Sequence, residues 1–100
     1  MHEQIRDILL QHRGKSNAIT SKEISRMMGF PMEDTQSKSR KAIWETAEIF
    51  SLPLISCSRG YFIAENDEEM EEYNSNIQRR IDGMEKTREM VNKFYQESKK

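Results

Sequence analysis

Apolar residues recur at helical spacing in the first part of the chain. This spacing predicts a helix over residues 2–13, and Gly14 is expected to end it because glycine tolerates the left-handed conformation found at helix ends. The next two apolar residues, Ala18-Ile19, are too few to form more than a single β-bridge. The chain is therefore expected to begin with a helix, a polar turn and a very short extended segment.

A capping box marks the start of a second helix. The Thr20 hydroxyl can accept from the Glu23 amide, while the Glu23 carboxylate can reach back to the Thr20 amide. The helix is expected to stop at Gly29. Its apolar stripe is formed by Ile24, Met27 and Met28.

A third helix is expected after a turn at Phe30-Pro31-Met32, since the residue before a proline avoids helical geometry. Asp34 or Thr35 can cap this helix, which runs to about Phe50. The inward positions are predicted to be Ile43, Ala47 and Phe50, with Trp44 beside them.

After Pro53 the pattern changes to that of strands. Residues 54–58 and 61–64 are rich in strand-forming side chains and flank Arg59-Gly60, where glycine can supply the positive φ of a tight hairpin turn. The sequence therefore predicts a two-stranded hairpin that turns over at Arg59-Gly60.

The last segment reads as one long helix. Asn66 or Asp67 can cap it, and several glutamates follow at the positive end of the helix dipole. Nothing stops the pattern before about Gln96, which gives roughly 29 residues, or about 44 Å. Gly83 is its one weak point, costing about 1 kcal/mol relative to alanine.

The predicted order of helix, short extended segment, helix, turn, helix and hairpin is that of a winged helix-turn-helix domain. The fold class is therefore mainly α with a small β-hairpin: a winged helix-turn-helix domain over residues 1–64, then one long C-terminal helix over residues 65–100.

The strings AITSKEISRMMG, SRKAIWETAEIF, LPLISCSRGYFIA and ENDEEMEEY carry a family resemblance. The chain resembles small winged-helix proteins encoded by bacteriophages, prophages and mobile elements of Gram-positive bacteria. The resemblance covers most of the chain, and the hairpin string with the acidic helix start is its most specific part. It implies a winged-helix fold and either DNA binding or a role in controlling replication or transcription.

In such a domain the third helix lies in the major groove. Its first half is polar and basic, and arginine and lysine can bond guanine edges while serine and glutamine bond bases or phosphates. Arg59 at the hairpin tip can reach the minor groove or a phosphate, and Lys15 is a further phosphate contact. The candidate DNA-binding residues are Lys22, Gln36, Ser37, Lys38, Ser39, Arg40, Lys41 and Arg59.

A plain structural interpretation stands beside this one. Polar residues at a helix start are also an ordinary solvated surface, and Arg40 can pair with Glu33 or Asp34. Glu45 and Glu48 would repel phosphates and limit any DNA contact to the first two turns of the helix.

Apolar residues in the long helix alternate at four- and three-residue steps, as in a coiled coil. Asn74 and Arg88 fill the two polar positions of this stripe, and Tyr73 and Phe94 widen it. The alternative is that the first turns of the helix pack on its own head. The candidate dimerisation residues are Met70, Ile77, Ile81, Met84, Val91 and Tyr95.

The charge distribution leaves the type of partner open. The net charge is −1. Residues 1–64 hold nine Lys/Arg against seven Asp/Glu, whereas residues 65–100 hold seven against ten. A mildly basic head permits DNA binding without proving it, and the acidic tail keeps a protein partner in view.

Other residue types suggest no chemistry. Cys57 stands alone in a strand and is expected to be a small buried residue, and an unpaired cysteine suits the cytoplasm. His2 and His12 lack neighbours at metal-ligand spacing, and Trp44 and Tyr61 are expected to be core and hairpin-packing aromatics. With no nucleophile–base pair, phosphate loop, secretory signal or membrane-spanning run, we expect a cytoplasmic non-enzyme without metal or cofactor.

Two functional hypotheses follow. The first is a phage-type or mobile-element-type regulator of transcription or replication that binds double-stranded DNA as a homodimer. The alternative is a winged-helix protein-interaction module, such as a replication accessory factor or a phage inhibitor of a host or defence enzyme.

Overall fold

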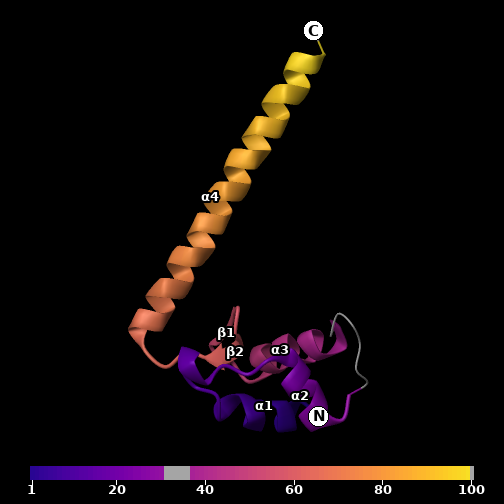
Figure 1. The fold of residues 1–100 in the computed structure, drawn as a ribbon, viewed down its shortest axis with the longest axis vertical. Helices are drawn as coiled ribbons and strands as arrows, with labels where there is room; N and C mark the ends of the chain where they lie inside the picture. The colour runs from indigo at the N-terminus through magenta and orange to yellow at the C-terminus, as the bar shows by residue number, and fades with distance from the viewer. Residues whose placement is uncertain (31–36, 100) are drawn as a thin grey trace. The chain divides into compact units, whose positions relative to one another are not determined.

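The computed structural model describes residues 1–30 and 37–99, and its element order is that of a mainly helical chain with one hairpin and a long C-terminal helix (Figure 1). The chain divides into two compact units, Met1–Glu69, called the head below, and Met70–Lys100. The elements are α1 (His2–Leu10), η1 (Lys15–Asn17), α2 (Ser21–Met28), α3 (Ser37–Ile49), β1 (Leu54–Cys57), β2 (Gly60–Ile63) and α4 (Asp67–Ser98).

The first helix ends earlier than the apolar pattern predicts. It stops at Leu10, not at residue 13, because the following backbone pairs with β2. The Ile63 amide donates to the His12 carbonyl and the Gly14 amide donates to the Ile63 carbonyl, both at 2.9 Å. Gly14 does have a positive φ of 85°, but it starts the 3₁₀ turn and does not cap α1.

The second helix has the bounds that its capping signals predict. Thr20 Oγ1 accepts from the Glu23 amide at 3.1 Å, and Gly29 ends the helix in the left-handed conformation with φ 71°. The predicted contact of the Glu23 carboxylate with the Thr20 amide is wrong, because this carboxylate pairs with Arg26. Met27 is also not an inward residue, since it is exposed, whereas Ile24 is fully buried.

The third helix presents more small polar residues to the core than the hydropathy pattern indicates. Ile43 and Ala47 are buried as predicted, and Phe50 is half-buried just beyond the helix end. Thr46 is fully buried as well, and its hydroxyl donates to the Ala42 carbonyl at 2.7 Å. The predicted turn at residues 31–32 and the caps at residues 34–35 lie outside the described residues.

The hairpin pairs Leu54 with Ile63 and Cys57 with Gly60. Its turn therefore consists of Ser58 and Arg59, and Gly60 is the first residue of β2 and not part of the turn as expected. Gly60 is nevertheless required to be glycine, because its φ is 122° and a Cβ there would collide with the Ile19 carbonyl.

The predicted one-residue bridge at Ile19 is confirmed. Ile19 pairs with Tyr61, with the Ile19 amide donating at 2.8 Å and the Tyr61 amide donating at 2.7 Å. Ile19 thus acts as a third, one-residue strand beside β2. This pairing fixes the start of α2 against the hairpin.

One apolar core joins α1, α2 and α3 to the hairpin. Its fully buried members are aliphatic, and burial of each such side chain stabilises the fold by about 1.5–3 kcal/mol. They come from α1, α2, α3 and β2 and include Ile5, Leu9, Ile24, Ile43 and Ile63.

The first turn of α4 belongs to the head. Asn66 caps the helix as predicted, accepting from the Glu69 amide at 2.9 Å. The Glu69 carboxylate accepts from the backbone amides of Lys15 at 2.7 Å and Glu65 at 2.8 Å. These bonds explain why the division between the units falls after Glu69. Within the described part of the chain, no helix has the length and apolarity needed to cross a membrane.

Candidate nucleic-acid interface

The outward side of α3 carries the basic residues that the sequence singled out. Lys38, Arg40 and Lys41 are all exposed. At 100° per residue, Lys41 lies opposite the buried face, with Lys38 on one flank and Arg40 on the other. The first two turns of α3 therefore present three cations to solvent.

Ser39 does not belong to this surface. Its side chain is 2% exposed, and its hydroxyl bonds the hydroxyl of Ser25 on α2. Ser25 in turn donates to the Ser21 carbonyl at 2.9 Å. Ser39 thus joins α2 to α3 inside the head and is not accessible to a nucleic acid, which corrects the sequence expectation.

The structure does not describe the side chains of two further candidates. Gln36 lies outside the described residues. Ser37 is the first residue of α3, and only its backbone is described.

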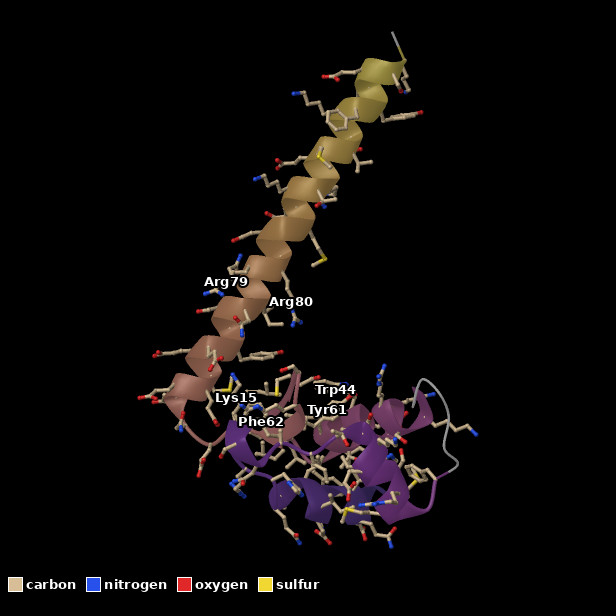
Figure 2. The ribbon with its side chains drawn as sticks, viewed as in Figure 1. Lys15, Trp44, Tyr61, Phe62, Arg79 and Arg80 are labelled. Carbon is tan, nitrogen blue, oxygen red and sulfur yellow. The ribbon has the colours of Figure 1, made fainter. Side chains whose placement is uncertain are left out.

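The prediction that Trp44 lies in the core is also wrong. Trp44 is 44% exposed on the outward side of α3, one turn after Lys41. The expected contact with the hairpin is present, because Trp44 meets Tyr61 edge-on with 5.9 Å between ring centroids (Figure 2). An aromatic ring therefore lies beside the cations, between α3 and β2.

The remaining two candidates lie at the hairpin and at α2. Arg59 is exposed in the hairpin turn, and Lys22 is exposed in the first turn of α2. The Ile19–Tyr61 pairing holds this end of α2 next to the hairpin. In the described part of the chain, His2–Glu45, Arg6–Asp7 and Arg26–Glu23 form ion pairs, and none of these three pairs involves Lys22, Arg59 or the three cations on α3.

Carboxylates restrict the basic surface to the first half of α3. His2 Nε2 lies 3.2 Å from a carboxylate oxygen of Glu45, and Glu48 is exposed one turn further on. A hollow of about 320 Å³ next to these residues is lined by Met1, Phe30, Lys38, Lys41, Ala42 and Glu45. The cationic part of the face therefore ends near Trp44.

By residue type, the histidines and the cysteine of the head are candidate metal ligands or reactive groups. Over residues 1–30 and 37–99, no group of three or more His, Cys, Asp or Glu side chains could hold a metal ion. His12 Nδ1 lies 2.7 Å from the Asn17 carbonyl. Cys57 is half-buried in β1 and not fully buried as expected.

The candidate dimerisation residues lie along α4. Four of them, Ile81, Met84, Val91 and Tyr95, are exposed, together with Met90 and Phe94. Met70 and Ile77 are partly exposed on the same helix. In comparisons with protein-family models, curated proteins and solved structures, none matches this chain.

Proposed function

We propose that residues 1–64 form a winged helix-turn-helix domain that binds double-stranded DNA, in a phage-type or mobile-element-type regulator of transcription or replication. The observation that carries this proposal is the order of elements around the Ile19–Tyr61 bridge. Helix, one-residue strand, helix, helix and hairpin follow one another as in winged-helix domains. The third helix of that order is the one that enters the major groove.

The distribution of charge on the head supports this docking. Lys38, Arg40 and Lys41 occupy the first two turns of α3, which is the part that comes nearest to base edges. Arg59 at the hairpin turn can follow the backbone into the neighbouring minor groove. Trp44 lies between α3 and the hairpin and can make an apolar contact with a thymine methyl group.

A titration of DNA affinity at two salt concentrations tests the proposal. The combined variant Lys38→Ala, Lys41→Ala, Arg59→Ala should bind at least tenfold more weakly, because it loses three phosphate or base contacts. The slope of log affinity against log salt should fall by up to about 2.7, since each phosphate contact contributes about 0.9. Fluorescence anisotropy with labelled duplexes from the surrounding genome measures both quantities.

A matched control removes the same charge elsewhere. The variant Arg79→Ala, Lys86→Ala, Lys93→Ala takes three cations from the side of α4 away from its apolar stripe. It should keep the affinity and the salt slope of the unaltered protein. Equal losses in both variants, or none in either, would contradict the assignment of α3 and the hairpin as the DNA-binding face.

The proposed form is a homodimer held by α4. An isolated helix with several exposed large apolar side chains on one side is stabilised when that side is covered. Ile81, Met84, Val91 and Tyr95 supply such a surface. Sedimentation equilibrium should give twice the chain mass of 11.9 kDa.

A second candidate function is a protein-interaction module. Its support is the exposed Trp44 and Ile49 on α3, together with a net charge of only −1. This candidate predicts no DNA retention at low salt and stoichiometric binding of one protein, which Trp44→Ala should weaken. The same DNA titration therefore separates the two candidates.

A further inference from the structure

The apolar stripe of α4 has the same spacing when read from either end. Its positions alternate by four and three residues over residues 70–95. Two antiparallel copies can therefore face each other along the whole stripe, with residues 82 and 83 at the centre. In this alignment Met70 lies opposite Tyr95, Asn74 opposite Val91, Ile77 opposite Arg88, and Ile81 opposite Met84.

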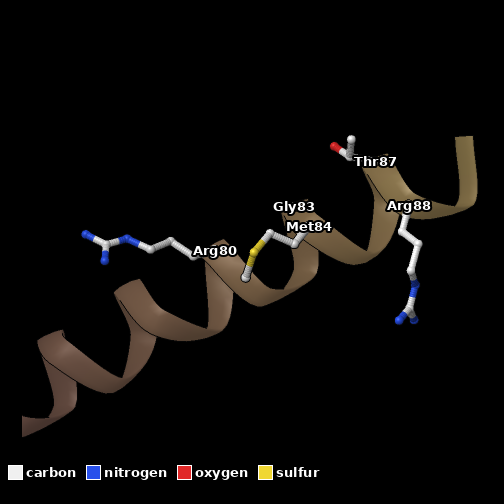
Figure 3. A pocket seen from close by; sticks show the side chains of 5 residues that line it. All are labelled: Arg80, Gly83, Met84, Thr87 and Arg88. Atoms are coloured by element: carbon white, nitrogen blue, oxygen red, sulfur yellow. The ribbon is translucent and has the colours of Figure 1, made fainter. Parts of the chain in front are cut away.

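A shallow hollow lies beside the middle of the stripe. It is lined by Arg80, Gly83, Met84, Thr87 and Arg88 (Figure 3). Met84 and Arg88 belong to the stripe, whereas Arg80 and Thr87 lie on one flank of it and Gly83 lies further round the helix. Gly83 leaves the hollow open because it has no side chain. In the antiparallel alignment, Ile81 of the second copy lies opposite Met84 at the edge of this hollow.

Arg88 distinguishes the two possible directions. In a parallel pair, every stripe residue faces its own copy, so the two Arg88 guanidinium groups would lie against each other inside the contact. In the antiparallel pair, each Arg88 faces Ile77 instead. The two Arg88 residues of the pair are then separated by eleven residues along the helix axis, or about 16 Å. Repulsion between like charges therefore favours the antiparallel direction.

The charges at the ends of α4 favour the same direction. Five of the first six residues are acidic, Asp67, Glu68, Glu69, Glu71 and Glu72. A parallel pair would align these carboxylates with their own copies. An antiparallel pair places them beside residues 93–98, which include only one carboxylate, Glu97. It also opposes the two helix dipoles.

The parallel pair would gain less in exchange. It would place Asn74 against Asn74, a pairing that coiled-coil cores tolerate. It would also bring Arg80 near Glu85, but an exposed ion pair adds little to stability. The antiparallel pair instead brings Tyr73 near Phe94 at both ends.

We therefore propose that two copies of this chain pair antiparallel through α4, centred on residues 82 and 83. This inference rests on the homodimer proposed above and adds its direction and register.

Disulfide trapping in the full chain tests the direction. In a Cys57→Ser background, Asn74→Cys and Val91→Cys are prepared as single variants with tags of different size. When the two are mixed and mildly oxidised, the mixed disulfide dimer should be the main product, because residues 74 and 91 face each other. Val91→Cys alone should trap at least tenfold less, because its two copies lie about 25 Å apart along the pair.

Each other outcome overturns the inference. Efficient trapping of Val91→Cys alone would indicate a parallel pair, and a monomer in sedimentation equilibrium at all concentrations would remove the dimer itself. The DNA titration is independent of this result. A chain that binds DNA but traps in parallel contradicts only the direction, whereas an antiparallel dimer without DNA affinity contradicts only the proposed function.

Discussion

Gly60 combines two constraints at a single residue. Its φ of 122° is unfavourable for any L side chain, and the space where a Cβ would lie is occupied by the backbone of Ile19 and Thr20. The neighbouring backbone cannot move aside without breaking the bridge between Ile19 and Tyr61. This close approach holds the hairpin to the start of α2.

Gly60→Ala should therefore lower the free energy of unfolding by roughly 2–5 kcal/mol, from backbone strain and overpacking together. Urea denaturation followed by Trp44 fluorescence measures the change. Gly83→Ala is the control, because a Cβ there has nothing within 4 Å and a helical glycine replaced by alanine gains up to about 1 kcal/mol. Equal stability of the two variants would contradict the close approach at Gly60.

Single residues of α3 also show where sequence reasoning reached its limit. Hydropathy places Trp44 inside and Ser39 outside, whereas the structure has them the other way round. Ser39 and Thr46 can be buried because their hydroxyls have partners in Ser25 and the Ala42 carbonyl. Such pairings join residues of different elements or successive turns, and apolar spacing does not reveal them.

At the scale of elements, the sequence correctly predicted those helix ends that are set by hydrogen bonds within a few residues. The Thr20 cap, the Gly29 terminus and the Asn66 cap are each formed within a few residues, and each was predicted. The predicted end of α1 and the predicted turn residues of the hairpin were wrong. Both depend on pairing between residues about fifty or forty positions apart, His12 with Ile63 and Ile19 with Tyr61.

Glu69 makes the most consequential contact between elements. Its carboxylate satisfies two backbone amides, those of Lys15 and Glu65, at the junction of η1 and α4. Hydrogen bonds to a charged group contribute about 1.5–3 kcal/mol each at most, and less where the group is partly exposed. The residue therefore fixes the start of α4 to the head.

Glu69→Ala should lower the free energy of unfolding of the head by about 1–3 kcal/mol, because both amides lose their acceptor. Thermal unfolding monitored by circular dichroism and Trp44 fluorescence gives this value. Glu68→Ala changes the same charge in the same turn at an exposed position and should have little effect. A loss of similar size in both variants would show that helix-dipole electrostatics, and not these two bonds, stabilise the junction.

At the scale of the whole molecule, the sequence predicted the element types and their order, including the long final helix. It placed the boundary between the two parts at residue 64, whereas the compact units divide after Glu69. Of the residues predicted to bind DNA, Lys22, Lys38, Arg40, Lys41 and Arg59 are exposed, while Ser39 is internal. Which exposed surface meets a partner is a property of the complex, so its assignment stays a prediction.

The pairing of residues 12–19 with β2 also determines how the head opens. The amides of Gly14, Ile19, Tyr61 and Ile63 each bond a residue more than forty positions away. We expect their hydrogens to exchange with solvent when the head unfolds as a unit. These four amides should be the slowest to exchange in deuterated water, at a rate that reports the global free energy of unfolding. Amides of α4 beyond Met70 should exchange faster in dilute protein and slow down as the concentration rises. Faster exchange at Ile19 than within α1 would mean that the hairpin detaches before the helices separate.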